Sequence, residues 1–212
     1  MILRKLLYNF ILRAIRLIPT GIPLIILRGP LRGYKVITGA SAGRGKGLSI
    51  IFNRSEPERL KFAKDLTLPN FICFDIGANV GIYSLLFAKY SKFVYAFEPF
   101  PRNLKFLNKT INLNKVENVK IIPYAVTNKE GVSWFQEGEN VAEGKLSPGG
   151  ALKVKTISLD NFIKKKGIEP NLLKIDVEGA ELSVLEGAKN YMLENKPVLL
   201  IETHGDTLKK NC

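Results

Sequence analysis

Residues 71–81, with the sequence FICFDIGANVG, constrain the fold of this chain more than any other segment. Four apolar residues lead into Asp75, Gly77 and Gly81 follow four positions apart, and an apolar helix-like run begins at Ile82. This order predicts a buried strand, a tight turn and the start of a helix. Such a turn lets a nucleotide-like ligand lie against bare backbone, so the segment indicates a cofactor site.

The alternation of strand and helix continues along the chain. We expect strands at residues 71–75, 93–97, 119–125, 151–158, 172–176 and 197–203. We expect helices at residues 81–90, 101–113, 159–166 and 180–192. Residues 126–150 are rich in glycine and predict a loop-rich insert with one strand at 132–136. Strands that alternate with helices predict an α/β fold with a doubly wound, mostly parallel sheet.

Positive charge is concentrated in the first third of the 212 residues. Residues 1–64 hold 13 Lys and Arg against 2 Asp and Glu, whereas residues 65–212 hold 19 against 17. We therefore expect two parts, a basic amphipathic extension or small subdomain at 1–64 and a cofactor-binding domain at 65–212. Because the second part is nearly balanced in charge, we do not expect a nucleic-acid partner.

Residues 1–17 carry apolar and basic residues at helical spacing. This pattern predicts peripheral membrane contact through residues 1–27, with packing on the chain's own domain or on a second copy as the alternative. The sequence contains no run of 18 or more apolar residues, so we expect no transmembrane helix. Cys73 lies in an apolar strand and Cys212 ends the chain, which favours a reducing, cytoplasmic setting.

Acidic residues stand at the ends of several expected strands. The first strand ends at Asp75, the second at Glu98, a later one at Asp176, and the last at Glu202 and His204. Parallel strands place their carboxyl ends at one edge, where ligands bind. An acid after the second strand can accept hydrogen bonds from ribose hydroxyls. An acid before the glycine turn would repel a pyrophosphate but suits an ammonium and a sulfonium, so the pattern favours S-adenosylmethionine over NAD.

Several motifs of this chain resemble the FkbM-type methyltransferase family over about residues 70–205. They are residues 75–81, residues 97–99 with Asn103, residues 159–160, the run LKIDVEGAE at 173–181, and residues 201–204. The resemblance implies a Rossmann-like, class I, S-adenosylmethionine-dependent methyltransferase that acts on a hydroxyl oxygen. It also implies sugars, glycolipids and natural products as the substrate class.

The resemblance assigns roles to individual positions. The expected cofactor-binding residues are Asp75, Gly77, Ala78, Asn79, Gly81, Glu98 and Ala125. Asp176 matches the acid beside the reacting methyl group. The candidates for a general base are His204, the only histidine, then Asp176 and Glu178. We expect no metal, with convergence of Asp176, Glu202 and His204 on a metal ion as the alternative.

Lys174 interrupts an apolar strand. A buried lysine needs a partner, so we expect it to pair with an acid such as Glu202, or to extend its ammonium out of the sheet. Eight residues follow His204, which is too short for the strand hairpin that usually ends this fold. We therefore expect either a truncated domain or one whose exposed strand at 197–203 is covered by another chain, with a second copy as one possibility. The alternative function is a non-catalytic relative that keeps the fold for assembly.

Overall fold

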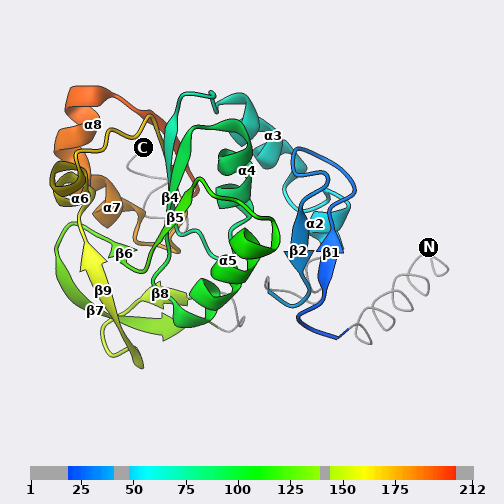
Figure 1. The fold of residues 1–212 in the computed structure, drawn as a ribbon. Helices are drawn as coiled ribbons and strands as arrows, with labels where there is room; N and C mark the ends of the chain where they lie inside the picture. The colour runs from blue at the N-terminus through cyan, green and yellow to red at the C-terminus, as the bar shows by residue number, and fades with distance from the viewer. Residues whose placement is uncertain (1–18, 41–47, 139–143, 204–212) are drawn as a thin grey trace, which may run out of the picture.

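The computed structural model describes residues 19–40, 48–138 and 144–203, and its centre is a five-stranded parallel sheet (Figure 1). The strands lie in the order β11-β10-β3-β4-β5. Their bounds are Ile72–Ile76 for β3, Phe93–Phe97 for β4, Val119–Ile122 for β5, Leu172–Ile175 for β10 and Val198–Ile201 for β11. The last residues of neighbouring strands are in register, so all five carboxyl ends meet at one edge. The predicted doubly wound α/β sheet is confirmed.

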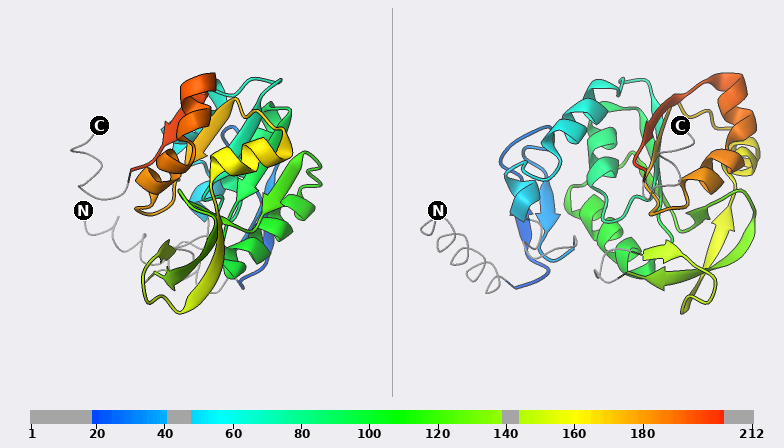
Figure 2. Two further views of the ribbon diagram at one scale, coloured as in Figure 1. Left: turned by 90° about the vertical axis from the view of Figure 1, so that its left-hand side faces the viewer. Right: turned by 180° about the vertical axis from the view of Figure 1, so that it is seen from behind.

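Helices cover both faces of this sheet (Figures 1 and 2). One face carries α3 (Pro57–Asp65), α4 (Ile82–Tyr90) and α5 (Pro101–Leu113), and the other carries α6 (Leu159–Lys166), α7 (Glu181–Gly187) and α8 (Lys189–Asn195). Successive side chains of a strand point to opposite faces. In β3, Cys73 therefore joins the core under α4, whereas Phe74 and Ile76 join the core under α6 and α7.

The predicted insert is a second sheet rather than a loop-rich segment. Its strands have the order β6-β9-β7-β8, with bounds Ala125–Val126, Leu152–Ile157, Gly131–Glu137 and Gly144–Leu146. The strands expected at 132–136 and 151–158 are confirmed as β7 and β9. The single strand expected at 119–125 is wrong, because the chain leaves the first sheet at Pro123 and pairs β6 with β9 instead. A proline cannot donate a hydrogen bond to a strand ladder.

The helix expected at 180–192 is two helices, α7 and α8, that meet at Ala188. Gly187 ends α7 against the second sheet, since a Cβ on it would lie 2.1 Å from the carbonyl oxygen of Thr127. The carboxylate of Asp160 accepts hydrogen bonds from the backbone N–H groups of Asn190 and Tyr191, at 3.1 and 2.9 Å. These bonds cap the new helix at its first turn.

The described part of the N-terminal segment packs on the sheet domain. It contains the hairpin β1 (Pro23–Ile25) and β2 (Lys35–Ile37), α2 (Leu48–Ile51) and α3. Ile26, Leu31 and Ile51 share one hydrophobic core with Leu86 and Phe87 of α4. The division between residues 64 and 65 stays a prediction. The amphipathic stretch at 1–17 lies outside the described residues.

Two further predictions concern a membrane-spanning helix and the outer edge of the sheet. Within the described ranges, no helix has the length and apolar character needed to cross a membrane. Among the described strands, β11 forms one outer edge of the five-stranded sheet. Pairing of this edge with a second copy stays a prediction.

Candidate active site

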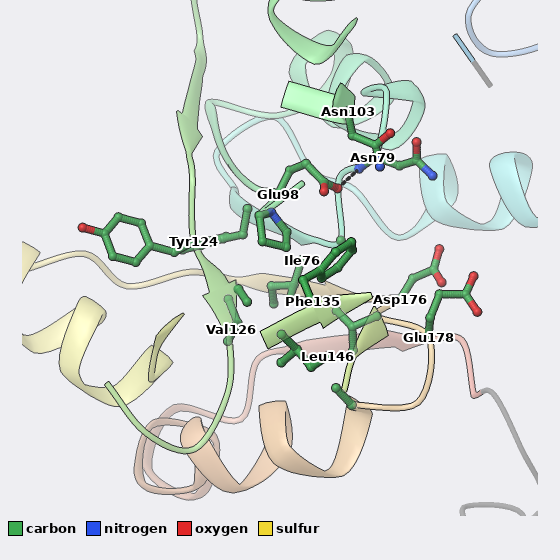
Figure 3. Close-up of a pocket in the computed structure, with 16 residues that line it drawn as sticks. Ile76, Asn79, Glu98, Asn103, Tyr124, Val126, Phe135, Leu146, Asp176 and Glu178 are labelled. Atoms are coloured by element: carbon green, nitrogen blue, oxygen red, sulfur yellow. Dashed lines mark hydrogen bonds between the residues drawn. The ribbon is translucent and has the colours of Figure 1, made fainter. Parts of the chain in front are cut away.

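A pocket lies at the carboxyl edge of the five-stranded sheet and encloses about 680 Å³ of empty space, counting its open mouth (Figure 3). Segments that follow β3, β4 and β10 form one side, and the second sheet forms the other. The lining residues are Ile76, Gly77, Asn79, Phe97, Glu98, Pro99, Asn103, Tyr124, Ala125, Val126, Phe135, Leu146, Asp176, Val177, Glu178 and Ala180.

The turn after β3 adopts left-handed backbone at two of its positions. Gly77 has φ 79° and Asn79 has φ 51°. A Cβ on Gly77 would lie 1.8 Å from the carbonyl oxygen of Asp176. The glycine predicted to make room for a ligand is therefore required first by contact with the loop after β10. This contact joins two walls of the pocket.

Glu98 follows β4 and is held by backbone donors. Its Oε2 accepts a hydrogen bond from the N–H of Asn79 at 2.7 Å, and its Oε1 accepts one from the N–H of Phe100 at 2.9 Å. Burial raises the pKa of Glu98 to about 7, although hydrogen bonds from Phe100, Asn79 and Asn103 and the charge of Lys174 act to lower it. The carboxylate is thus oriented at the pocket wall, where it can accept hydroxyl hydrogen bonds.

The second sheet supplies an apolar wall that sequence reasoning missed. Phe135 of β7 is 5% exposed and stacks on Phe100, with ring centroids 5.3 Å apart. Leu146 of β8 packs beside Phe135, and Val126 of β6 also lines the pocket (Figure 3). The alternation of Ser133, Trp134 and Phe135 predicts a strand, but it does not show which element the side chain of Phe135 packs against.

Asp176 and Glu178 extend side by side from the loop after β10, on the side of the pocket away from Tyr124 (Figure 3). Glu178 has φ 52° and Gly179 has φ 96°. A glutamate in left-handed backbone is strained, and such strain is concentrated at functional sites. Glu181, at the start of α7, stabilises the loop by accepting a hydrogen bond from the N–H of Gly179 at 3.0 Å.

Asp75 lies beneath the turn rather than in the pocket. Its side chain is fully buried, and its Oδ2 accepts a hydrogen bond from Oγ of Ser84 at 2.6 Å. Its Oδ1 is 3.3 Å from Nζ of Lys174. The geometry does not support the predicted direct contact of Asp75 with the cofactor, because α4 and β10 already surround its carboxylate.

Lys174 has partners other than the predicted Glu202. Strand register places it beside Asp75, and its Nζ is 3.2 Å from Oδ2 of Asp176. Glu202 forms an ion pair with Arg59 of α3 instead. The expectation that a buried lysine needs an acid is confirmed, and the choice of Glu202 is wrong.

A second hollow, of about 670 Å³ including its open side, adjoins the pocket. The two share Gly77, Asn79 and Asp176. Its outer wall comes from the N-terminal segment and includes Ser55 and Glu56. The N-terminal segment therefore reaches the candidate site, a contribution that the sequence did not predict.

The structure brings most of the predicted site residues together. Six line the pocket, namely Gly77, Asn79, Glu98, Ala125, Asp176 and Glu178. Ala78 lines the second hollow. Gly81 precedes α4 as its N-cap, outside the lining of both hollows, and a Cβ on it would lie 2.6 Å from Cδ1 of Leu107. His204 lies outside the described residues. Within the described ranges, no group of three or more His, Cys, Asp or Glu is arranged for a metal ion.

The charge of the pocket decides which cofactor fits. Its described lining includes Glu98, Asp176 and Glu178 but no Lys or Arg, in a chain of net charge +13. A pyrophosphate would face three acids, of which Asp176 has Lys174 beside it, whereas a ligand with an ammonium and a sulfonium is complementary to them. The residues present therefore fit S-adenosylmethionine.

Comparison with known proteins agrees with this fit. Residues 75–211 match the methyltransferase FkbM domain. The chain belongs to this family. Membership, together with the topology of the five-stranded sheet, establishes a Rossmann-like class I methyltransferase fold with S-adenosylmethionine as the cofactor.

The individual relatives share only a small part of their sequence with this chain. The hexuronic acid methyltransferase AglP of Haloferax volcanii is 29% identical over 155 residues, which cover 71% of this chain and 63% of that protein. The chain thus spans less than two thirds of that relative. The crystal structure of methyltransferase FkbM from Methylobacillus flagellatus KT is 18% identical, with a TM-score of 0.48 over 74% of this chain and 43% of the other. Precorrin-6y C5,15-methyltransferase from Geobacter metallireducens GS-15 is 14% identical, with a TM-score of 0.49 over 74% and 67%.

Proposed function

We propose that this methyltransferase transfers the methyl group of S-adenosylmethionine to a hydroxyl oxygen of a sugar, glycolipid or natural product. The observation that carries the cofactor placement is the acid-lined pocket between Glu98 and the loop of Asp176 and Glu178. The similarity to a hexuronic acid methyltransferase supports a sugar as the acceptor. The cofactor supplies a methyl group on a positively charged sulfur, whose C–S bond breaks as the new C–O bond forms.

The pocket lining supports a placement for each end of the cofactor. Glu98 and Ala125 suit the adenosine end, because a carboxylate can accept ribose hydrogen bonds beside an apolar wall. The shared wall of Gly77 and Asp176 suits the amino-acid end, and the second hollow adds the carboxylate of Glu56 there. The acceptor would then approach from the side of the pocket that Asp176 and Glu178 line.

The chain must also take the hydroxyl proton of the acceptor. Asp176 and Glu178 hold carboxylates in the lining of the pocket, and His204 follows three residues after the end of β11. Any of them acting as general base would contribute about 10²–10⁴-fold. Positioning of the acceptor supplies the remaining acceleration.

Transfer from labelled S-adenosylmethionine to a panel of glycosides tests this function. The panel includes a glucuronide, its neutral glucoside and the glucoside with all hydroxyls methylated. Methylation of the first two, located on oxygen by mass spectrometry, supports the proposal. Methylation of the glucuronide on its carboxylate alone, with no transfer to a hydroxyl of either sugar, would contradict it.

The alternative is a relative that keeps the fold for assembly without catalysis. Calorimetry with S-adenosylmethionine separates the two functions. A folded protein that does not bind the cofactor favours the assembly role. Contact of residues 1–27 with a membrane and pairing through the edge of β11 stay proposals alongside either function.

A further inference from the structure

Lys174 joins the core of the sheet to the wall of the pocket. Its side chain is 6% exposed on β10. Its Nζ is 3.3 Å from Oδ1 of Asp75 and 3.2 Å from Oδ2 of Asp176, and it donates a hydrogen bond to the carbonyl oxygen of Gly77 at 3.2 Å. The ammonium therefore donates to one backbone carbonyl and forms ion pairs with two carboxylates.

The two carboxylates of this cluster differ in their surroundings. Asp75 is fully buried and is also bonded to Ser84, whereas the side chain of Asp176 is 26% exposed and lines both hollows. One acid is enough to compensate a buried ammonium. The second contact therefore extends the influence of Lys174 from the core to a residue at the pocket surface.

Lys174 carries its positive charge in this position. Burial alone would lower the pKa of Lys174, but the charges and hydrogen bonds of Asp75 and Asp176 raise it above its usual value. The ring of Tyr83 lies 4.9 Å from Nζ and covers the ammonium with a surface that favours cations. A cation beside Asp176 weakens the attraction of that carboxylate for a second cation.

We propose that Lys174 is a positioning residue that acts through Asp176, holding its carboxylate at the pocket wall and moderating its attraction for the positively charged cofactor. This inference rests on the cofactor placement proposed above. Methyl transfer removes the positive charge from sulfur, so an unpaired carboxylate would stabilise the cofactor more than the transition state. Such stabilisation lowers turnover, and pairing with Lys174 limits it.

The test compares two ligands that differ in the charge on sulfur, S-adenosylmethionine and S-adenosylhomocysteine. The double variant Asp75→Asn, Lys174→Met removes one buried acid and one buried base, so no unpaired charge is left in the core and the net charge of the protein is unchanged. Calorimetry gives the Kd of each ligand. We expect the Kd of S-adenosylhomocysteine divided by the Kd of S-adenosylmethionine to rise about tenfold over the wild type, because the charge of Lys174 no longer offsets that of Asp176.

Matched variants isolate the cause. Asp75→Asn alone keeps Lys174 and should not raise the ratio. Lys120→Met removes an exposed lysine of β5 in the same sheet and should leave the ratio unchanged. Adding Asp176→Asn to the double variant should abolish the increase, since Lys174 acts through that carboxylate. If the Lys174→Met change prevents folding, Lys174→Gln in the Asp75→Asn background gives the same comparison. The glutamine amide can still donate a hydrogen bond to the carbonyl oxygen of Gly77.

The outcomes distinguish this inference from the proposed function. A change of both Kd values by one common factor would show a purely structural role and overturn the inference alone. Persistence of the raised ratio after Asp176→Asn would also overturn it. Failure of the folded wild type to bind either ligand would overturn the proposed function and the inference with it.

Discussion

The backbone N–H of Asn79 donates a 2.7 Å hydrogen bond to Oε2 of Glu98, which ties the turn after β3 to the end of β4 (Figure 3). The other carboxylate oxygen accepts the N–H of Phe100. Glu98 is therefore held in one orientation by two segments before any ligand arrives. Such preorganisation reduces the ordering cost of binding.

Replacement of Glu98 by alanine should weaken the binding of S-adenosylhomocysteine by about 10–100-fold. The change removes a charged hydrogen-bond acceptor, which is worth about 1.5–3 kcal/mol, and leaves the N–H of Asn79 without its carboxylate. Calorimetry measures the Kd. Glu117→Ala is the control, because this exposed acid lies outside the pocket. Unchanged affinity in Glu98→Ala would refute its role at the ribose.

Stability should depend on pH through the same residue. The pKa of Glu98 is about 7 in the folded state against an ordinary value of 4.5. Between these values the folded protein binds a proton that the unfolded chain lacks, so the free energy of unfolding falls as pH rises and levels off above about pH 7. The total change from this group is about 3 kcal/mol.

Urea denaturation from pH 4.5 to 8 measures this dependence in the wild type and in Glu98→Gln. The amide does not titrate, so the variant should lack this part of the decline. The difference in unfolding free energy between the two proteins should therefore change across the range. A difference that stays constant with pH would show that Glu98 titrates normally.

Much of the site was predictable because strand ends are visible in the sequence. Glu98 and Asp176 each follow an apolar run, and parallel strands bring such ends together. The burial of Asp75 was not predictable, since it depends on Ser84 of α4 and on the register with Lys174. Contacts of this kind arise between elements that are distant in sequence.

The second sheet shows where local patterns are insufficient. Pro123 signals the end of β5, but only the pairing of β6 with β9 shows that a new sheet begins. The helix α3 was missed although Pro57 stands in its first turn, where proline is favoured. Phe135 could be placed on a strand, but its position over the pocket depends on packing against Phe100.

Replacement of Gly77 by alanine should destabilise the protein by about 3 kcal/mol or more. The alanine would have to adopt a left-handed backbone conformation, at a cost of about 1–2 kcal/mol. Its Cβ would also collide with the carbonyl oxygen of Asp176. Gly179→Ala is the matched control, because Gly179 has φ 96° but no atom within 4 Å of its Cβ position. Denaturant unfolding of both variants separates backbone strain from steric conflict. Equal losses in the two would contradict the close contact.

Replacement of His204 by alanine should lower turnover by about 10²–10⁴-fold if this residue is the general base. The affinity for S-adenosylhomocysteine should stay at the wild-type value, because the residue would act on the acceptor alone. Asp176→Asn and Glu178→Gln are compared in the same transfer assay. Wild-type turnover in His204→Ala would remove it as the base and leave the two carboxylates as candidates.

Replacement of Phe135 by alanine should weaken cofactor binding at least about tenfold and destabilise the protein by about 3–5 kcal/mol. The buried ring forms the apolar wall of the pocket and stacks on Phe100. Its loss therefore leaves a gap in the pocket wall and removes the packing against Phe100. Trp134→Ala is the control on the same strand, since this side chain is 43% exposed and lies 4.9 Å from Nζ of Lys153 on the opposite face. Its loss should cost about 1 kcal/mol or less and leave the Kd unchanged. Calorimetry and denaturant unfolding report both effects, and equal losses of affinity in the two variants would show that the second sheet does not form the pocket wall.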